Sequence, residues 1–179
     1  YADIRDRDRM ECIVGSLKPD AVLHLAAQVA VTTSVANPRD DFEINALGPA
    51  KLIADYRANP KEVAPILLIG HSLGGDAAIV MANWLIQNRV PVRLVVVFDA
   101  VAQVHPVNAG VEEGINFYKP KGYGQKVEAS ASFKGTINNV DLTDRTDIDH
   151  LNIDKDPVIQ QEVIARVMTI LAAANGAKP

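Results

Sequence analysis

Short, mostly apolar runs alternate with longer stretches of helical periodicity, and this alternation constrains the fold most strongly. The clearest apolar runs lie at residues 65–70 and 92–98, with another at 21–26. Apolar residues recur at helical spacing over 73–88 and 157–173. Strands that are apolar on both faces need helices on both sides of the sheet. The sequence therefore predicts an α/β fold of three layers, α/β/α, around a mostly parallel sheet.

The N-terminal part carries its own helix signals. Apolar residues at helical spacing predict a helix over 7–17. Asn37 followed by Pro38 is a favourable helix start, with Asn as N-cap and Pro at the first helical position. Pro49 lies inside the helical stretch that follows, where it removes a hydrogen bond and clashes with the preceding turn. We therefore expect a kink or a break there.

The region after residue 100 is less regular. Residues 101–125 are rich in Gly, Pro and Asn and predict a long loop with a short strand near 115–118. Residues 126–133 alternate between polar and apolar, as a half-exposed strand at a sheet edge would. Residues 141–156 form an acidic segment that predicts a loop before the final helix.

Length and composition exclude several classes of protein. The chain has 179 residues, of which 48% are hydrophobic and 22% charged, as in an average globular domain, so we expect a single domain over 1–179. The net charge of −4 argues against a nucleic-acid surface. A single cysteine, Cys12, provides neither an internal disulfide nor a thiolate metal cluster. Each continuous apolar run is shorter than the ~18 residues of a membrane span, so no span is expected. Localisation stays open.

The five residues Gly70-His71-Ser72-Leu73-Gly74 match the pattern G-x-S-x-G, between a predicted strand and a predicted helix. This context is typical of a nucleophile elbow, in which the backbone turns sharply and presents the serine at the carboxyl edge of the sheet. Glycines two residues before and after Ser72 would let the neighbouring backbone pass closely. N–H groups at the helix start, that of Leu73 first, would face a developing oxyanion.

A serine nucleophile needs a base, and the chain has four histidines. We expect His71 to pack or hydrogen-bond locally, since its side chain points away from the elbow. His24 lies in a predicted buried strand. His105 lies in a loop, where a surface or turn position and a functional role both stay open. His150 precedes the final helix, where the base of an α/β-hydrolase falls in chain order. It is the preferred base.

The base in turn needs an orienting carboxylate. Asp99 ends the strand that follows the elbow helix, so it should stand at the same sheet edge as Ser72. The order Ser72, Asp99, His150 is that of nucleophile, acid and base in this fold. Other carboxylates stay open as alternatives: the loop residues Asp141, Asp144 and Asp147, and the less suitable Asp149 beside the base.

Two different resemblances divide the chain. Residues 53–179 resemble an α/β-hydrolase of lipase or thioesterase type, through 68–77, 95–99, 116–118 and 149–154. This resemblance implies hydrolysis of a small acyl ester or thioester, with Ser72 as nucleophile, and no cofactor or metal.

Residues 1–52 are instead similar to an internal, Rossmann-like fragment of the NAD-dependent epimerases and dehydratases of the extended short-chain dehydrogenase family. The residues that carry this are 19–28, Asn37-Pro38 and 45–48. The resemblance implies that Asp3 and Ile4 lie near an adenine. The family's glycine motif and its Tyr-x-x-x-Lys pair are absent from this sequence, so we expect no useful NAD affinity.

Together these features predict a chimera with a seam near 48–55, and the absence of a first methionine fits a cut fragment. The main functional prediction is a weakly active serine hydrolase, because the second oxyanion donor would have to come from 27–31. The alternatives are an engineered chimeric scaffold without efficient catalysis and, more remotely, an NAD-binding oxidoreductase fragment. A truncated sheet would leave an unpaired edge strand, which favours a homodimer.

Overall fold

The structure is a computed structural model that describes residues 65–176, together with positions 9, 12, 16, 53, 54 and 56–60. The chain divides into two compact units, Tyr1–Ala64 and Pro65–Pro179. Several predictions lie outside the described residues: the strand at 21–26, the helix start at Asn37, the break at Pro49 and most of the helix at 7–17. The single domain with parts 1–52 and 53–179 stays a prediction.

The second unit is built on a four-stranded sheet in the order β1-β2-β3-β4, and every neighbouring pair is parallel. The predicted α/β fold with a parallel sheet is confirmed, and it is consistent with a Rossmann-like architecture. The strands are β1 (Leu67–His71), β2 (Val92–Phe98), β3 (Val111–Tyr118) and β4 (Thr136–Asp141). The helices are α5 (Leu73–Gln87), the short 3₁₀-helix η2 (Ile153–Lys155) and α6 (Pro157–Gly176).

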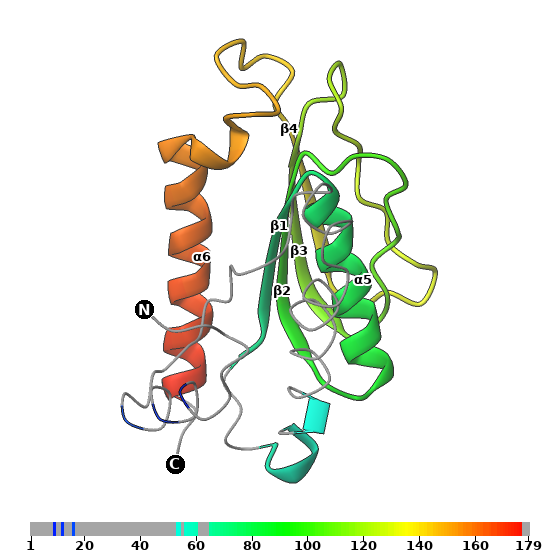
Figure 1. Ribbon diagram of the computed structural model, residues 1–179, viewed down its shortest axis with the longest axis vertical. Coiled ribbons are helices and arrows are strands. Elements are labelled where there is room, and N and C mark those ends of the chain that lie inside the picture. The colour runs from blue at the N-terminus through cyan, green and yellow to red at the C-terminus, as the bar shows by residue number, and fades with distance from the viewer. Residues whose placement is uncertain are drawn as a thin grey trace. The chain divides into compact units, whose positions relative to one another are not determined.

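Helices cover both faces of this sheet, as Figure 1 shows with α5 on one side and α6 on the other. The alternation of side chains along β2 explains the arrangement. Leu94, Val96 and Phe98 pack in one cluster with residues of α6, while Val97 points towards Gly75 of α5. Five consecutive residues of β2, from Leu94 to Phe98, are therefore buried, which accounts for its uninterrupted apolar sequence.

Strand β3 is longer than the sequence predicted. Residues 115–118 were expected to be a short strand, but the strand begins at Val111. Its first half escaped detection because Glu112 and Glu113 interrupt the apolar pattern. Both form ion pairs instead, Glu112 with Arg93 of β2 and Glu113 with Arg166 of α6. Charged residues at this end of the strand are thus compatible with pairing in the sheet.

The predicted edge strand at 126–133 is wrong, and β4, at 136–141, forms this edge of the described sheet beside β3. Side-chain amides bind the backbone of Val127 in the earlier segment and of Gln125 just before it. Asn139 accepts from the N–H of Val127 and donates to its carbonyl, and Asn116 donates to the carbonyl of Gln125. Ala129 forms an isolated bridge with Val107, so the segment 126–133 has one bridge and side-chain hydrogen bonds in place of a strand ladder.

Helix α6 is, by length and composition, apolar enough over Pro157–Ala174 to cross a membrane. Its residues Ile159, Val163 and Ile170 are buried in the cluster on the sheet, but only 17% of this window is buried. A single helix of this length and composition is weak evidence, because other kinds of helix pass the same test. The finding is therefore weak support for a membrane span.

The loop before α6 makes the unit sensitive to acid. Arg145 donates from Nη2 to both Asp147 and Asp156 at 2.7 Å. The hydrogen bond from Arg145 lowers the pKa of Asp147 to about 2. The backbone N–H of Ile159, at the start of α6, lowers the pKa of Asp156, and Arg145 adds to the effect. Both carboxylates therefore stabilise the fold at pH values above their ordinary pKa of about 4, and this stabilisation is lost as the pH falls towards 2.

We accordingly expect the urea midpoint to fall between pH 4 and pH 2. The Asp156→Asn variant, which has no charge to lose there, should show a smaller fall, and Asp144→Asn at an exposed site of the same loop should behave as wild type. Equal falls in all three proteins would contradict the assignment.

Candidate functional site

Ser72 lies at the turn between β1 and α5, and its backbone has φ 58° and ψ −126°. A positive φ is rare for a residue other than glycine and marks local strain, as the predicted elbow requires. The turn is held by hydrogen bonds, because the Ser72 N–H donates to Phe98 O at 2.9 Å and its carbonyl accepts from Gly75 N at 3.0 Å. The serine is thereby fixed beyond the carboxyl end of β1.

The glycines around the elbow do not share one role. A Cβ at Gly70 would overlap the backbone of Gly74 and approach Gly75 N within 2.9 Å. A Cβ at Gly74 would meet nothing within 4 Å, whereas one at Gly75 would press on Val97. The expectation that glycines on both sides permit a close approach is therefore correct for Gly70, but the second close approach is at Gly75 and not at Gly74.

This difference predicts opposite effects for two similar substitutions. Gly70→Ala should lower the free energy of unfolding by about 1–3 kcal/mol or more, because the clash involves backbone that cannot rotate away. Gly74→Ala should raise it by up to about 1 kcal/mol, since alanine favours the helix more than glycine does. Urea denaturation of both variants measures this, and a destabilised Gly74→Ala would contradict the assignment.

The three residues of the predicted triad lie together. His150 Nε2 is 2.9 Å from Ser72 Oγ, and His150 Nδ1 is 2.7 Å from Asp99 Oδ2. An ionised carboxylate only accepts hydrogen bonds, so Nδ1 carries the proton and donates it to Asp99. Nε2 is then free to accept from the hydroxyl of Ser72. This is the arrangement in which an imidazole can take the proton of a serine that attacks an electrophile.

Asp99 is only 1% exposed and follows β2, with a positive φ of 47°. Its two oxygens have separate partners, since Oδ2 accepts from His150 and Oδ1 from the backbone N–H of Lys119 at 2.8 Å. A buried charge needs such donors to offset its desolvation. A Cβ at Gly124 would overlap Oδ1, so the loop passes the carboxylate at a position where only glycine fits.

The loop carboxylates left open by the sequence have other partners. Asp141 accepts from the hydroxyl and the N–H of Thr143, and the hydroxyl hydrogen bond lowers its pKa. Asp147 pairs with Arg145, while Asp149 accepts from the N–H of Leu151. Asp144 is exposed on the same loop. Asp99 is therefore the carboxylate that meets the base.

Of the other described histidines, His105 lies at the surface and His71 contacts the site. His105 is exposed and pairs with Asp76 at 2.9 Å, in agreement with a surface position, and His24 lies outside the described residues. His71 differs from the expectation of local packing, because its Nε2 donates to the carbonyl of His150 at 2.7 Å and the two rings lie 4.8 Å apart. Its position next to Ser72 was the signal that could have indicated this contact.

Exposed apolar side chains border the triad. Leu73 follows Ser72 and is 56% exposed, and Leu151 follows His150 and is 73% exposed. Tyr123, 70% exposed, presents its ring edge-on to the imidazole of His150 with centroids 5.2 Å apart. The backbone N–H of Leu73 opens α5, as predicted for an oxyanion donor. The second donor expected from 27–31 lies outside the described residues.

Comparison with known proteins identifies relatives of the N-terminal part. Residues 1–68 match the family model for GDP-mannose 4,6 dehydratase. CDP-paratose 2-epimerase of Salmonella typhi is 42% identical over 57 residues, which are 32% of this chain and 17% of that protein. UDP-glucose 4-epimerase of Mycoplasma genitalium is 37% identical over 54 residues, 30% of this chain and 16% of that protein. A UDP-glucose 4-epimerase of Rhizobium leguminosarum bv. trifolii is 39% identical over 56 residues, which are 31% of this chain and 17% of that protein.

The chain thus spans about a sixth of the length of these relatives, and no solved structure matches it significantly. The N-terminal resemblance to the NAD-dependent epimerases and dehydratases is confirmed. The resemblance of residues 53–179 to an α/β-hydrolase has no counterpart in these matches.

These findings contradict the main functional prediction. The matches are to a dehydratase family and to epimerases, so serine hydrolase, lipase and esterase are not supported as descriptions of this protein, while a Rossmann-like description is. They favour the alternatives, the NAD-binding oxidoreductase fragment in particular. The prediction failed because a five-residue motif carries far less information than a similarity over more than 50 residues. The matched family segment ends at residue 68, before Ser72, so the roles of Ser72, Asp99, His150 and Leu73 stay predictions.

Proposed function

We propose that residues 1–68 are a segment of the dinucleotide-binding part of an NAD-dependent epimerase or dehydratase acting on nucleotide sugars. The observation that carries this is the match of these residues to the dehydratase family model, supported by epimerases that are 37–42% identical over 54–57 residues. By the resemblance, Asp3 and Ile4 contribute to the adenine end of the dinucleotide site.

The residues of the second unit do not fit the dinucleotide. A pyrophosphate needs a glycine turn at a helix N-terminus. Among residues 65–176 the glycine-rich turn from strand to helix is that of 70–75, and there Ser72 is bonded to His150. The sequence also lacks the Tyr-x-x-x-Lys pair of the family. We therefore assign no hydride step to this chain and restrict its proposed role to the adenine end.

Saturation-transfer NMR with NAD⁺ tests this role. We expect weak, saturable binding with more transfer to the adenine protons than to the nicotinamide protons, because a glycine turn for the pyrophosphate is lacking. Asp3→Ala should reduce the transfer, and Asp41→Ala serves as the matched control. A flat titration by both NMR and calorimetry would overturn the proposal.

A second candidate function rests on a separate observation, the hydrogen-bonded chain of Ser72, His150 and Asp99. We infer that residues 53–179 are related to the α/β-hydrolases and that Ser72 is a reactive nucleophile. His150 is the base, Asp99 orients it and the Leu73 N–H faces the developing negative charge. Efficient turnover of a substrate is not part of this inference, because the loss of one of the two oxyanion donors lowers kcat by about 10²–10³-fold.

A fluorophosphonate probe tests the nucleophile directly. Ser72 Oγ attacks phosphorus, the P–F bond breaks, fluoride leaves and the hydroxyl proton passes to His150 Nε2. We expect mass spectrometry to find the adduct on Ser72 in wild type and in Ser132→Ala, where an exposed serine elsewhere is replaced. Ser72→Ala should not be labelled. Absence of labelling in wild-type protein that melts cooperatively would overturn the inference.

A further inference from the structure

One residue contacts both the acid and the loop of the base. Lys119 directly follows β3, beside the end of β2, where Asp99 lies. Its backbone N–H donates to Asp99 Oδ1 at 2.8 Å, and its Nζ donates to the carbonyls of Arg145 and Ile148 at 2.6 Å each. We propose that Lys119 is a positioning residue that holds His150 between Asp99 and Ser72. The proposal rests on the reactive serine inferred above, and it goes beyond the three residues that form the triad.

The loop that carries His150 has its own hydrogen bonds around the histidine, since Asn152 accepts from the N–H of Asp149 and donates to the carbonyl of Asp147. The turn that precedes them, at 145–148, is closed less tightly. Ile148 N donates to Arg145 O at a long 3.3 Å, so the two carbonyls that Lys119 binds span a loosely closed turn. Two short hydrogen bonds from an ammonium group are stronger than neutral ones. They fix this turn two residues before His150, and the freedom of the imidazole is reduced accordingly.

Other contacts on the loop act elsewhere. Arg145 pairs with Asp147 and Asp156, and this anchors the loop to the start of α6. His71, which precedes Ser72 in the elbow, donates a hydrogen bond to the carbonyl of His150. Neither contact reaches Asp99, so Lys119 provides a second link between the base loop and the acid, beside the hydrogen bond of His150 itself. Since its backbone N–H is retained in any variant, substitution of the side chain releases the loop and leaves the acid in place.

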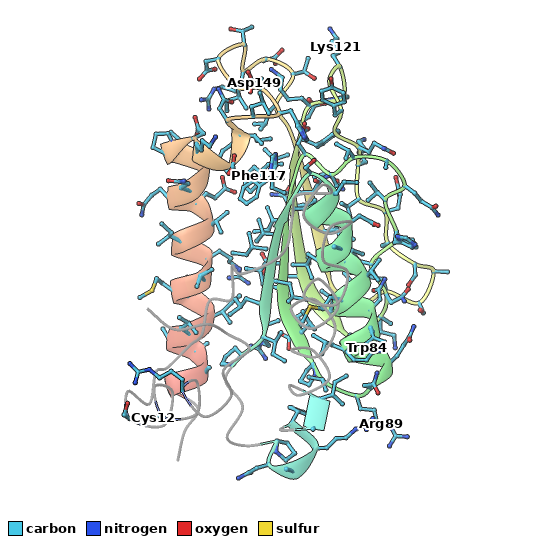
Figure 2. All side chains as sticks on the ribbon, viewed as in Figure 1. Cys12, Trp84, Arg89, Phe117, Lys121 and Asp149 are labelled. Atoms are coloured by element: carbon cyan, nitrogen blue, oxygen red, sulfur yellow. The ribbon has the colours of Figure 1, made fainter. Side chains whose placement is uncertain are left out.

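The test uses Lys119→Met, which keeps the apolar stem and removes the ammonium group. Lys121→Met is the matched control, because Lys121 is exposed in the same loop (Figure 2). One readout is the downfield proton NMR signal of the His150 Nδ1–H, assigned by its loss in His150→Gln. It reports the hydrogen bond to Asp99 whether or not Ser72 reacts. The other readout is the rate of fluorophosphonate labelling, with Lys119→Arg as the conservative variant.

We expect Lys119→Met to lose or broaden the Nδ1–H signal and to label about 10²-fold more slowly, the loss that a displacement of about 1 Å causes. Lys119→Arg should recover much of both, and Lys121→Met should match wild type. If Lys119→Met does not fold, Lys119→Gln, which keeps one donor group on a shorter stem, should weaken both readouts.

The two inferences fail in different ways. If wild-type protein shows the Nδ1–H signal but is not labelled, the inference that Ser72 is reactive is contradicted. Loss of the signal in Lys119→Met would still support the positioning role. An unchanged signal and rate in a folded Lys119→Met, or equal losses in Lys121→Met, would overturn the role of Lys119.

Discussion

Replacing Asp99 by asparagine is expected to slow fluorophosphonate labelling of Ser72 by about 10³–10⁴-fold. The geometry gives the reason. The Lys119 N–H requires an acceptor at Oδ1, so the amide of an asparagine would place its NH₂ group opposite His150 Nδ1. Two donors cannot face each other, and the imidazole proton would move to Nε2. Nε2 could then no longer accept the proton of Ser72.

This loss should leave the fold in place, because the hydrogen bond from Lys119 is kept and no volume changes. Circular dichroism melts and the labelling rate are measured together. Asp141→Asn is the control, since Asp141 bonds to Thr143 and not to His150. Labelling of Asp99→Asn at the wild-type rate would show that the carboxylate has no part in the reactivity, and a slow Asp141→Asn would point to another acid.

The second large effect concerns the core below the site. Phe117 is 1% exposed and stacks on Phe98 with ring centroids 5.6 Å apart. Figure 2 shows Phe117 between the sheet and α6, in agreement with its place in the buried cluster. Phe117→Ala should lower the free energy of unfolding by about 3–5 kcal/mol, because it removes buried apolar surface and leaves a cavity.

Urea denaturation measures this loss, and Met168→Ala is the matched control on the exposed side of α6, where Met168 is 59% exposed. Its free energy of unfolding should change by no more than about 0.5 kcal/mol. A loss below about 1 kcal/mol in Phe117→Ala would contradict the packing of α6 on this face. The backbone carbonyl of Phe117 accepts the N–H of Asp99. A shift of this backbone in Phe117→Ala would therefore displace the acid, and we also expect slower labelling of Ser72 in the folded fraction.

Much of the second unit follows from local sequence. The bounds of β2 coincide with the apolar run at 92–98, and the G-x-S-x-G pattern predicted the turn with a positive φ at Ser72. Such features depend on neighbours along the chain, because burial on both faces needs an apolar run and a sharp turn needs glycine. The N-terminal resemblance was also visible in short, ordered runs of residues, and the comparisons bear it out over 1–68.

Tertiary structure decided what depends on residues distant in sequence. The sequence preferred Asp99 but left the loop aspartates open. It also placed a strand at 126–133, where the amide of Asn139 instead binds the backbone of Val127. Neither His71 nor Lys119 was predicted to hold the loop of His150. Local patterns specify which segments are strands and turns, whereas a hydrogen bond across 20–80 residues exists only once the sheet has brought its strand ends to one edge.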